Sequence, residues 1–177
     1  MSRPPGAPVD HTLDAVHAAR SAIRLERHFE VSELSRLRDA TLPADREGDD
    51  GLDATFAFSL LEGRPAIDGE MSGTVYLRCQ RCLQPVAVPI AEDFQLVLVA
   101  DDEAQPEEFG GYEPVVVDAS RVDLQWLAEE QALLALPLVP LHEPGACVEA
   151  EDVPVAPAVE VEKQRPFGNL RELLQKR

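Results

Sequence analysis

Residues 55–60 read Thr-Phe-Ala-Phe-Ser-Leu, and this stretch decides the fold. Its large apolar residues alternate with small or polar ones, which is the period of a strand that buries one face. The Glu-Gly-Arg at residues 62–64 has the composition of a hairpin turn, and the alternation resumes over residues 66–78 and 86–98. The sequence therefore predicts consecutive antiparallel strands joined by tight turns.

The clearest helical pattern lies over residues 123–136, where apolar residues recur every three or four positions. Asp123 is suited to cap the first turn, and Pro137 ends the helix because proline cannot continue it. Glu129 and Glu130 then fall on a side of the helix that faces solvent.

Shorter helices are predicted over residues 13–24 and 32–39, where the apolar spacing is helical but brief. Residues 163–177 combine an apolar stripe with basic residues, which suggests a short helix at the end of the chain. Together these elements define an α+β fold. Its antiparallel sheet is either open or curled into a partial barrel, and it is accompanied by one clear helix and a short C-terminal helix.

Size and charge narrow the class of protein. The chain has 177 residues, enough for one domain with a substantial core. It carries 16 basic and 33 acidic residues, a net charge of −17. This charge excludes a protein that binds nucleic acid electrostatically over most of its surface. Three cysteines are too few for a disulfide framework, no signal peptide is recognisable, and prolines interrupt the longest apolar run. We therefore expect a cytoplasmic protein that does not span a membrane.

Composition divides the chain into four segments. Residues 1–10 are rich in proline and predict a flexible N-terminus, whereas residues 11–147 carry the α+β core domain. Residues 148–162 consist mainly of Val, Ala, Pro and acidic residues without periodicity, which predicts a flexible linker. Residues 163–177 form a basic C-terminal segment.

Every cysteine of the chain belongs to a candidate metal site. Cys79 and Cys82 form a Cys-x-x-Cys knuckle between two predicted strands, and His142 and Cys147 share the loop that follows the clear helix. Three thiols and one imidazole complete the four-ligand tetrahedron that zinc prefers. Because four protein ligands leave no open position for a substrate, we expect zinc here as a structural clasp between two loops.

Two other interpretations of the cysteine pair stay open: a reversible redox couple, and reduced thiols without a metal. A thioredoxin-type motif requires the first cysteine at the start of a helix, whereas Cys82 is followed by strand sequence punctuated by prolines. The sequence has no phosphate-binding glycine loop and no nucleophile elbow, and we expect His11, His17 and His28 to be surface residues. We therefore expect a protein without enzymatic activity.

Two groups of cations are candidates for RNA binding. Arg78 and Arg81 flank and occupy the knuckle, where a turn tied by metal holds guanidinium groups at fixed positions for phosphates. Their alternative role is to neutralise the thiolates. The second group lies in the C-terminal segment. Its members are Lys163, Arg165, Arg171, Lys176 and Arg177.

Residues 91–118 contain nine acidic side chains and no basic ones. The centre of this stretch is most simply a solvated loop, because runs of charge with proline and glycine rarely pack. The alternative role of the stretch is a docking strip for a basic protein.

Five stretches stand in a characteristic order along the chain. They are Leu77-Arg78-Cys79-Gln80-Arg81-Cys82, Tyr112-Glu113-Pro114, Val122-Asp123-Leu124, residues 132–142 with Cys147, and Pro166-Phe167. In their residues and in their order along the chain, these stretches resemble the YceD family of bacterial large-ribosomal-subunit RNA accumulation proteins. The resemblance extends from about residue 13 to the end of the chain.

The resemblance implies a role in the synthesis, processing or stability of 23S ribosomal RNA, and hence in assembly of the large subunit. It places Cys79, Cys82, His142 and Cys147 at the family's metal-ligand positions. We expect a non-enzymatic factor that contacts 23S RNA or its precursor particle. The alternative is an acidic chaperone or adaptor for a basic large-subunit ribosomal protein, which affects 23S RNA indirectly.

Overall fold

The computed structural model describes residues 11–44, 50–100 and 109–147, and the structural statements below concern these residues. The chain divides into two units, Met1–Cys147 and Val148–Arg177, and only the first contains described residues. The predicted flexible N-terminus, the acidic linker, the basic C-terminal helix and the centre of the acidic loop lie outside the described residues.

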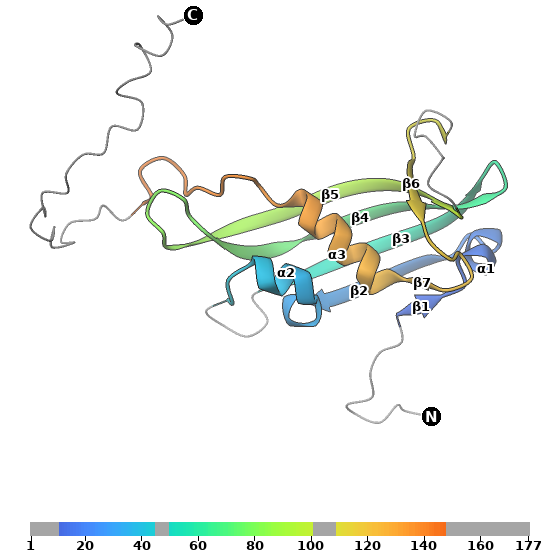
Figure 1. The fold of residues 1–177 in the computed structure, drawn as a ribbon, viewed down its shortest axis with the longest axis horizontal. Coiled ribbons are helices and arrows are strands. Elements are labelled where there is room, and N and C mark those ends of the chain that lie inside the picture. The colour runs from blue at the N-terminus through green and yellow to red at the C-terminus, as the bar shows by residue number, and fades with distance from the viewer. Residues whose placement is uncertain (1–10, 45–49, 101–108, 148–177) are drawn as a thin grey trace, which may run out of the picture. The chain divides into compact units, whose positions relative to one another are not determined.

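Five strands form one sheet in the order β2-β3-β4-β5-β6 (Figure 1). The strands are β2 Arg24–Glu30, β3 Gly51–Leu61, β4 Arg64–Arg78, β5 Pro85–Val99 and β6 Glu113–Val116. Strands β2 to β5 pair antiparallel in sequence order, which confirms the predicted sheet. Strand β6 pairs parallel with the end of β5, and the sheet stays open and does not close into a barrel.

The turn between β3 and β4 is the one that the sequence predicts. Leu61 pairs with Arg64, so Glu62 and Gly63 form a two-residue loop. Both loop residues have positive φ, 50° and 81°, as the tightest hairpin turns require. Glycine adopts this conformation without a steric cost, and its position in the turn therefore helps to fix the register between β3 and β4.

Three helices and a short 3₁₀ helix accompany the sheet. They are α1 Ala15–Arg20, η1 Val31–Glu33, α2 Ser35–Ala40 and α3 Leu124–Ala135. Two short strands, β1 Thr12–Leu13 and β7 Val122–Asp123, pair with each other and bring the start of the chain to the start of α3. None of the described helices is long and apolar enough to cross a membrane.

All three helices pack on the same face of the sheet. Their buried residues join those of the strands in one apolar cluster, in which Phe56 and Ile67 of the sheet and Leu127 of α3 are almost completely buried. Burying a side chain of this size contributes roughly 1.5–3 kcal/mol. Gly69 leaves room for the Phe94 ring, because a Cβ atom at Gly69 would lie 2.0 Å from that ring.

The N-terminal part departs from the predicted helices. The helix expected over residues 13–24 is only the six-residue α1, and β2 begins where that helix was expected to end. Strand β2 escaped prediction because four of its seven residues are exposed, and three of these carry a full charge, so the alternation is hidden. The helix expected over residues 32–39 is divided into η1 and α2.

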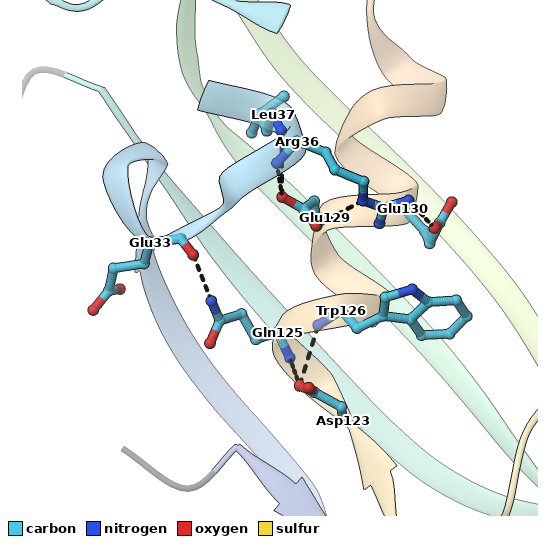
Figure 2. Close-up of polar contacts among 8 residues, drawn as sticks. All are labelled: Glu33, Arg36, Leu37, Asp123, Gln125, Trp126, Glu129 and Glu130. Carbon is cyan, nitrogen blue, oxygen red and sulfur yellow. Dashed lines mark hydrogen bonds and ion pairs between the residues drawn. The ribbon is translucent and has the colours of Figure 1, made fainter. Parts of the chain in front are cut away.

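Glu129 is a clear correction to the sequence prediction, because it is buried and only 7% exposed. Its Oε1 accepts hydrogen bonds from the backbone N–H groups of Arg36, at 2.7 Å, and Leu37, at 3.3 Å (Figure 2). Helix α2 begins after Leu34, a residue that has no side-chain acceptor for these amides. A carboxylate from α3 therefore caps α2, and the Arg36 guanidinium, whose Nε lies 3.0 Å from Oε2, compensates its charge.

Helix α3 itself follows its local signals. The Asp123 carboxylate accepts from the N–H groups of Gln125 and Trp126 at 2.9 and 3.2 Å, and the helix ends two residues before Pro137 (Figure 2). The Gln125 side chain donates to the Glu33 carbonyl at 2.6 Å, which adds a second tie between α3 and the η1–α2 segment.

We predict that Glu129→Ala lowers the free energy of unfolding by about 2–4 kcal/mol, because it removes a buried acceptor of two backbone N–H groups and leaves Arg36 without its buried partner. Urea unfolding of purified variants measures this change. Glu130→Ala is the matched control, since Glu130 also pairs with Arg36 but is more exposed and accepts no backbone N–H in the described structure. Equal losses in the two variants would contradict the capping role.

Candidate metal centre

The β4–β5 hairpin reaches beyond the rest of the sheet. Pairing between β3 and β4 ends at Gly51 and Thr74, whereas pairing between β4 and β5 continues to Arg78 and Pro85. The buried residues near the hairpin end form a small apolar cluster separate from the main core. They are Leu77, Cys79 and Val86. So little apolar surface stabilises this end only weakly.

Cys79 and Cys82 lie on the turn at this end of the hairpin. The turn is closed by two backbone hydrogen bonds of 2.9 Å each, one from Cys79 N to Gln84 O and one from Leu83 N to Cys79 O. Leu83 has a positive φ of 63°, an uncommon backbone conformation for a branched side chain. The turn holds both thiols on one side, Cys79 buried and Cys82 half-buried.

The loop after α3 runs back to the hairpin turn. Gln80 N donates to Pro140 O at 3.0 Å, and the Gln80 side chain donates to Leu138 O at 3.1 Å. These bonds hold residues 138–140 beside the turn. They deliver His142 and Cys147 to the side of the turn where the two other thiols lie.

The structure brings all four predicted ligands together. The ligand atoms of Cys79, Cys82, His142 and Cys147 lie within 4.8 Å of one another. Cys79 Sγ and Cys147 Sγ are 3.8 Å apart, and His142 Nδ1 lies 3.3 Å from Cys82 Sγ and 3.7 Å from Cys147 Sγ. A group of this composition can hold a metal ion.

The measured separations fit an ion with the size and geometry of zinc. Tetrahedral bonds of about 2.3 Å to sulfur and about 2.0 Å to nitrogen place two sulfurs about 3.8 Å apart, and a sulfur and a nitrogen about 3.5 Å apart. The observed sulfur–sulfur distance of 3.8 Å matches, and the sulfur–nitrogen distances of 3.3 and 3.7 Å lie on either side. Three of the six ligand separations thus agree with tetrahedral zinc, and none of the others exceeds 4.8 Å.

His142 is oriented for coordination by a second contact. Its Nε2 lies 3.0 Å from the carbonyl oxygen of Pro85, which can only accept a hydrogen bond. The proton of the neutral imidazole therefore belongs on Nε2, and the lone pair of Nδ1 points toward the thiols. A backbone carbonyl that fixes the ring and tautomer of a histidine ligand is a common feature of metal sites.

The thiols differ in how readily they ionise. Burial raises the pKa of Cys79, but backbone N–H groups of the two loops, among them those of Cys82 and His142, outweigh burial and lower it to about 5. The N–H of Gln84 lowers the pKa of Cys82, but burial and the other thiols raise it above its ordinary value. Three thiolates repel one another at this distance, and a divalent cation removes that conflict.

Arg81 faces the metal centre. Its Nε donates to Cys147 Sγ at 3.0 Å, and its Nη2 donates to the carbonyl of His142 at 2.9 Å. Contact with the thiol raises the pKa of Arg81. These contacts favour the neutralising role over the phosphate-binding role for Arg81. Arg78 is exposed at the end of β4 and is not part of the cluster.

The remaining residues that sequence analysis considered, three histidines and five C-terminal cations, are not part of the cluster in the described structure. His17 and His28 are exposed and lie away from the metal centre, whereas His11 is half-buried with its ring 5.4 Å from that of Phe29. The C-terminal cations, Lys163, Arg165, Arg171, Lys176 and Arg177, lie outside the described residues. Sequence analysis did not show that Gln80 and Pro85 position the second loop and His142. These contacts involve backbone carbonyl groups, which every residue has, so they leave no pattern in the sequence.

The fold and the site define a small α+β protein in which a projecting hairpin and the loop after α3 bring together three thiols and one imidazole that can hold a metal ion. Residues 67–174 match the family described as "Large ribosomal RNA subunit accumulation protein YceD", and the chain belongs to this family. It is also 26% identical over 170 residues to the protein of that name from Haemophilus influenzae, covering 93% of this chain and 95% of the relative. No solved structure matches the chain.

We predict that the purified protein carries about one zinc ion per chain, and that Cys79→Ser, Cys82→Ser or Cys147→Ser each removes most of it. His142→Cys retains the metal, because a thiolate replaces the imidazole as ligand. Elemental analysis of desalted protein by mass spectrometry measures the zinc content. His17→Ala, at an exposed histidine away from the cluster, is the matched control, and zinc retained by the serine variants would refute the assignment.

We further predict that Arg81→Ala speeds the transfer of the metal to a chromogenic chelator, because the Cys147 sulfur loses a donor and the second loop loses its tie to the turn. Arg78→Ala leaves the rate of transfer unchanged, since Arg78 lies outside the cluster. Stopped-flow absorbance at matched pH and ionic strength compares the variants. Equal rates for the two variants would show that Arg81 does not hold the site together.

Proposed function

We propose that this protein is a non-enzymatic factor in the synthesis, processing or accumulation of 23S ribosomal RNA, and thereby in assembly of the large ribosomal subunit. The observation that carries the proposal is membership of a family described by its role in large-subunit ribosomal RNA accumulation. We place this activity in the cytoplasm, where ribosomal subunits of bacteria are assembled.

We propose that the metal is zinc and that its role is structural. Four protein ligands fill a tetrahedral shell and leave no position for a water molecule or a substrate. The cluster joins the end of the β4–β5 hairpin to the loop after α3, and both segments bury little apolar surface, since Leu83, Leu138 and Val139 are exposed. A redox role for Cys79 and Cys82 receives less support, because residues 80–82 form a turn and not the start of a helix.

We propose that RNA is contacted by Arg78 and by the basic C-terminal segment, residues 163–177. Arg78 is exposed next to the metal centre, so a rigid hairpin end presents its guanidinium to a phosphate. The C-terminal segment carries five cations and one acid within a chain of net charge −17. Local cations in an acidic protein restrict RNA contact to a small area, which disfavours indiscriminate binding.

An adaptor for a basic ribosomal protein is the second candidate function. The observation that favours it is the excess of 33 acidic over 16 basic residues. An acidic surface neutralises a cationic protein before it meets RNA, and 23S RNA then accumulates as an indirect result. In this alternative the acidic stretch at residues 91–118 belongs to the docking surface.

Crosslinking in growing bacterial cells, with identification of both RNA and protein partners, tests the proposal. We expect discrete 23S crosslinks with the full chain, and a several-fold loss both in a chain ending at residue 162 and in Arg78→Ala. Arg20→Ala, an exposed arginine on α1, is the matched control. Unchanged 23S crosslinks in the truncated chain and in Arg78→Ala would overturn the RNA contact, and a ribosomal protein recovered without RNA would favour the adaptor.

A further inference from the structure

The helices leave one face of the sheet without a partner. Alternate residues of β2 to β5 point away from the apolar core, and none of the described helices packs over them. Phe109 covers one end of this face, where it packs with Val97 and Val99. We refer to the remaining part, which is open to solvent, as the open face.

The register of the strands places carboxylates side by side on the open face. Glu26 of β2 is opposite Thr55 of β3, Thr55 is opposite Glu70 of β4, and Glu70 is opposite Asp93 of β5. The rows on either side of this one contribute further acidic side chains. The acidic residues of the open face are Glu26, Glu30, Asp53, Asp68, Glu70 and Asp93, and its basic residues are Arg24, His28 and, at the far end of β4, Arg78.

Two of these carboxylates form a pair that weakens the fold. Glu70 and Asp93 are directly opposite on neighbouring strands, both exposed, and like charges in such positions are destabilising. Arg24 relieves the repulsion only in part, because its Nη2 lies 3.6 Å from Glu70 and both side chains are more than half exposed. Opposite charges on neighbouring strands would stabilise a sheet face that only contacts solvent. Glu70 and Asp93 instead place like charges opposite each other.

The same region is hollowed. A depression of about 640 Å³ lies over the middle of β2 to β5. The acidic residues that line it are Glu26, Asp53, Glu70, Glu92 and Asp93, and its other charged residues are Arg27 and His28. His28 already has acidic partners, with Nδ1 2.8 Å from Asp53 and Nε2 3.2 Å from Glu30. Among the described residues, the carboxylates of Glu26 and Asp93 have no hydrogen-bond or ion-pair partner.

We propose that the open face is a docking surface for a cationic polypeptide segment, an extended stretch of arginine and lysine residues from another protein. Alternate side chains of an extended chain recur about every 6.7 Å, and neighbouring strands lie about 4.8 Å apart. Along the row from Glu26 to Asp93 the carboxylates therefore lie about 9.6 Å and then about 4.8 Å apart, because Thr55 stands between Glu26 and Glu70. Their total span of about 14.4 Å is close to the roughly 13.4 Å that three alternate cations of an extended segment cover, and the flexible side chains of arginine and lysine accommodate the unequal spacing. Guanidinium groups pair with carboxylates through two parallel hydrogen bonds, which adds specificity to the attraction.

Charge excludes RNA as the occupant of this face, because a phosphate backbone is repelled by the same carboxylates that attract a cation. Arg78, which is proposed for RNA, lies at the far end of β4, eight residues beyond Glu70. The inference goes beyond the proposed role toward 23S RNA and does not depend on it, and it holds whether or not the cationic partner is a ribosomal protein.

The experiment measures binding of a fluorescent octa-arginine peptide to the full chain by anisotropy at physiological ionic strength. The face variant, Glu26→Gln with Glu70→Gln and Asp93→Asn, should weaken binding by about tenfold. The control variant neutralises three exposed carboxylates elsewhere, by Asp39→Asn, Glu62→Gln and Glu143→Gln, and should weaken binding less than about twofold. Both variants have the same net charge, so a difference between them reports the surface and not the total charge.

Three further readouts keep the outcome decisive. The urea midpoint of the face variant should equal or exceed that of the unmodified protein, since a like-charge pair is relieved. A photoreactive form of the peptide should label residues in β2, β4 or β5. An oligouridylate of equal length should bind no better to the unmodified protein than to the face variant. Equal peptide affinities for the two variants, labelling confined to residues 101–108, or RNA binding that requires the carboxylates would each overturn the proposal.

Discussion

The structure depends on how the end of the β4–β5 hairpin is held. Both strands have 15 residues. The residue pairs nearest their shared turn extend beyond the end of β3 and beyond the main apolar core. Hydrophobic burial cannot fix this end, because only Leu77, Cys79 and Val86 are buried there. In the proposed role, a metal held by both loops supplies the missing constraint at one point, and hydrogen bonds from Gln80 and Arg81 also tie the two loops together.

The same one-sided architecture gives the protein two kinds of surface. Helices cover one face of the sheet and build the core, while the opposite face carries exposed carboxylates, among them Glu70 and Asp93 directly opposite each other. Arg78 is exposed at the hairpin end, and the sequence of residues 163–177 is basic, whereas the chain as a whole is acidic. Cations confined to parts of an acidic chain suit the proposed contacts with RNA and with a basic protein.

The sequence predicted those features whose signals are local or chemically restrictive. Asp123 and Pro137 mark the ends of α3 from within a few residues, and three cysteines with one histidine leave few alternatives for a ligand set. Glu129 was placed wrongly because its partners are 93 residues earlier in the chain, and helical spacing does not reveal a buried ion pair. The inward orientation of Arg81 was not decidable either, since it depends on carbonyls of a loop that packs against it only in the folded protein.

The central claim is that Cys79, Cys82, His142 and Cys147 together bind one zinc ion in the native protein. X-ray absorption spectroscopy at the zinc edge of the protein as purified tests this most directly. The account predicts a four-coordinate shell with three sulfurs at about 2.3 Å and one nitrogen at about 2.0 Å. A shell made only of nitrogen and oxygen, or protein that retains no zinc while the hairpin end stays ordered, would contradict it.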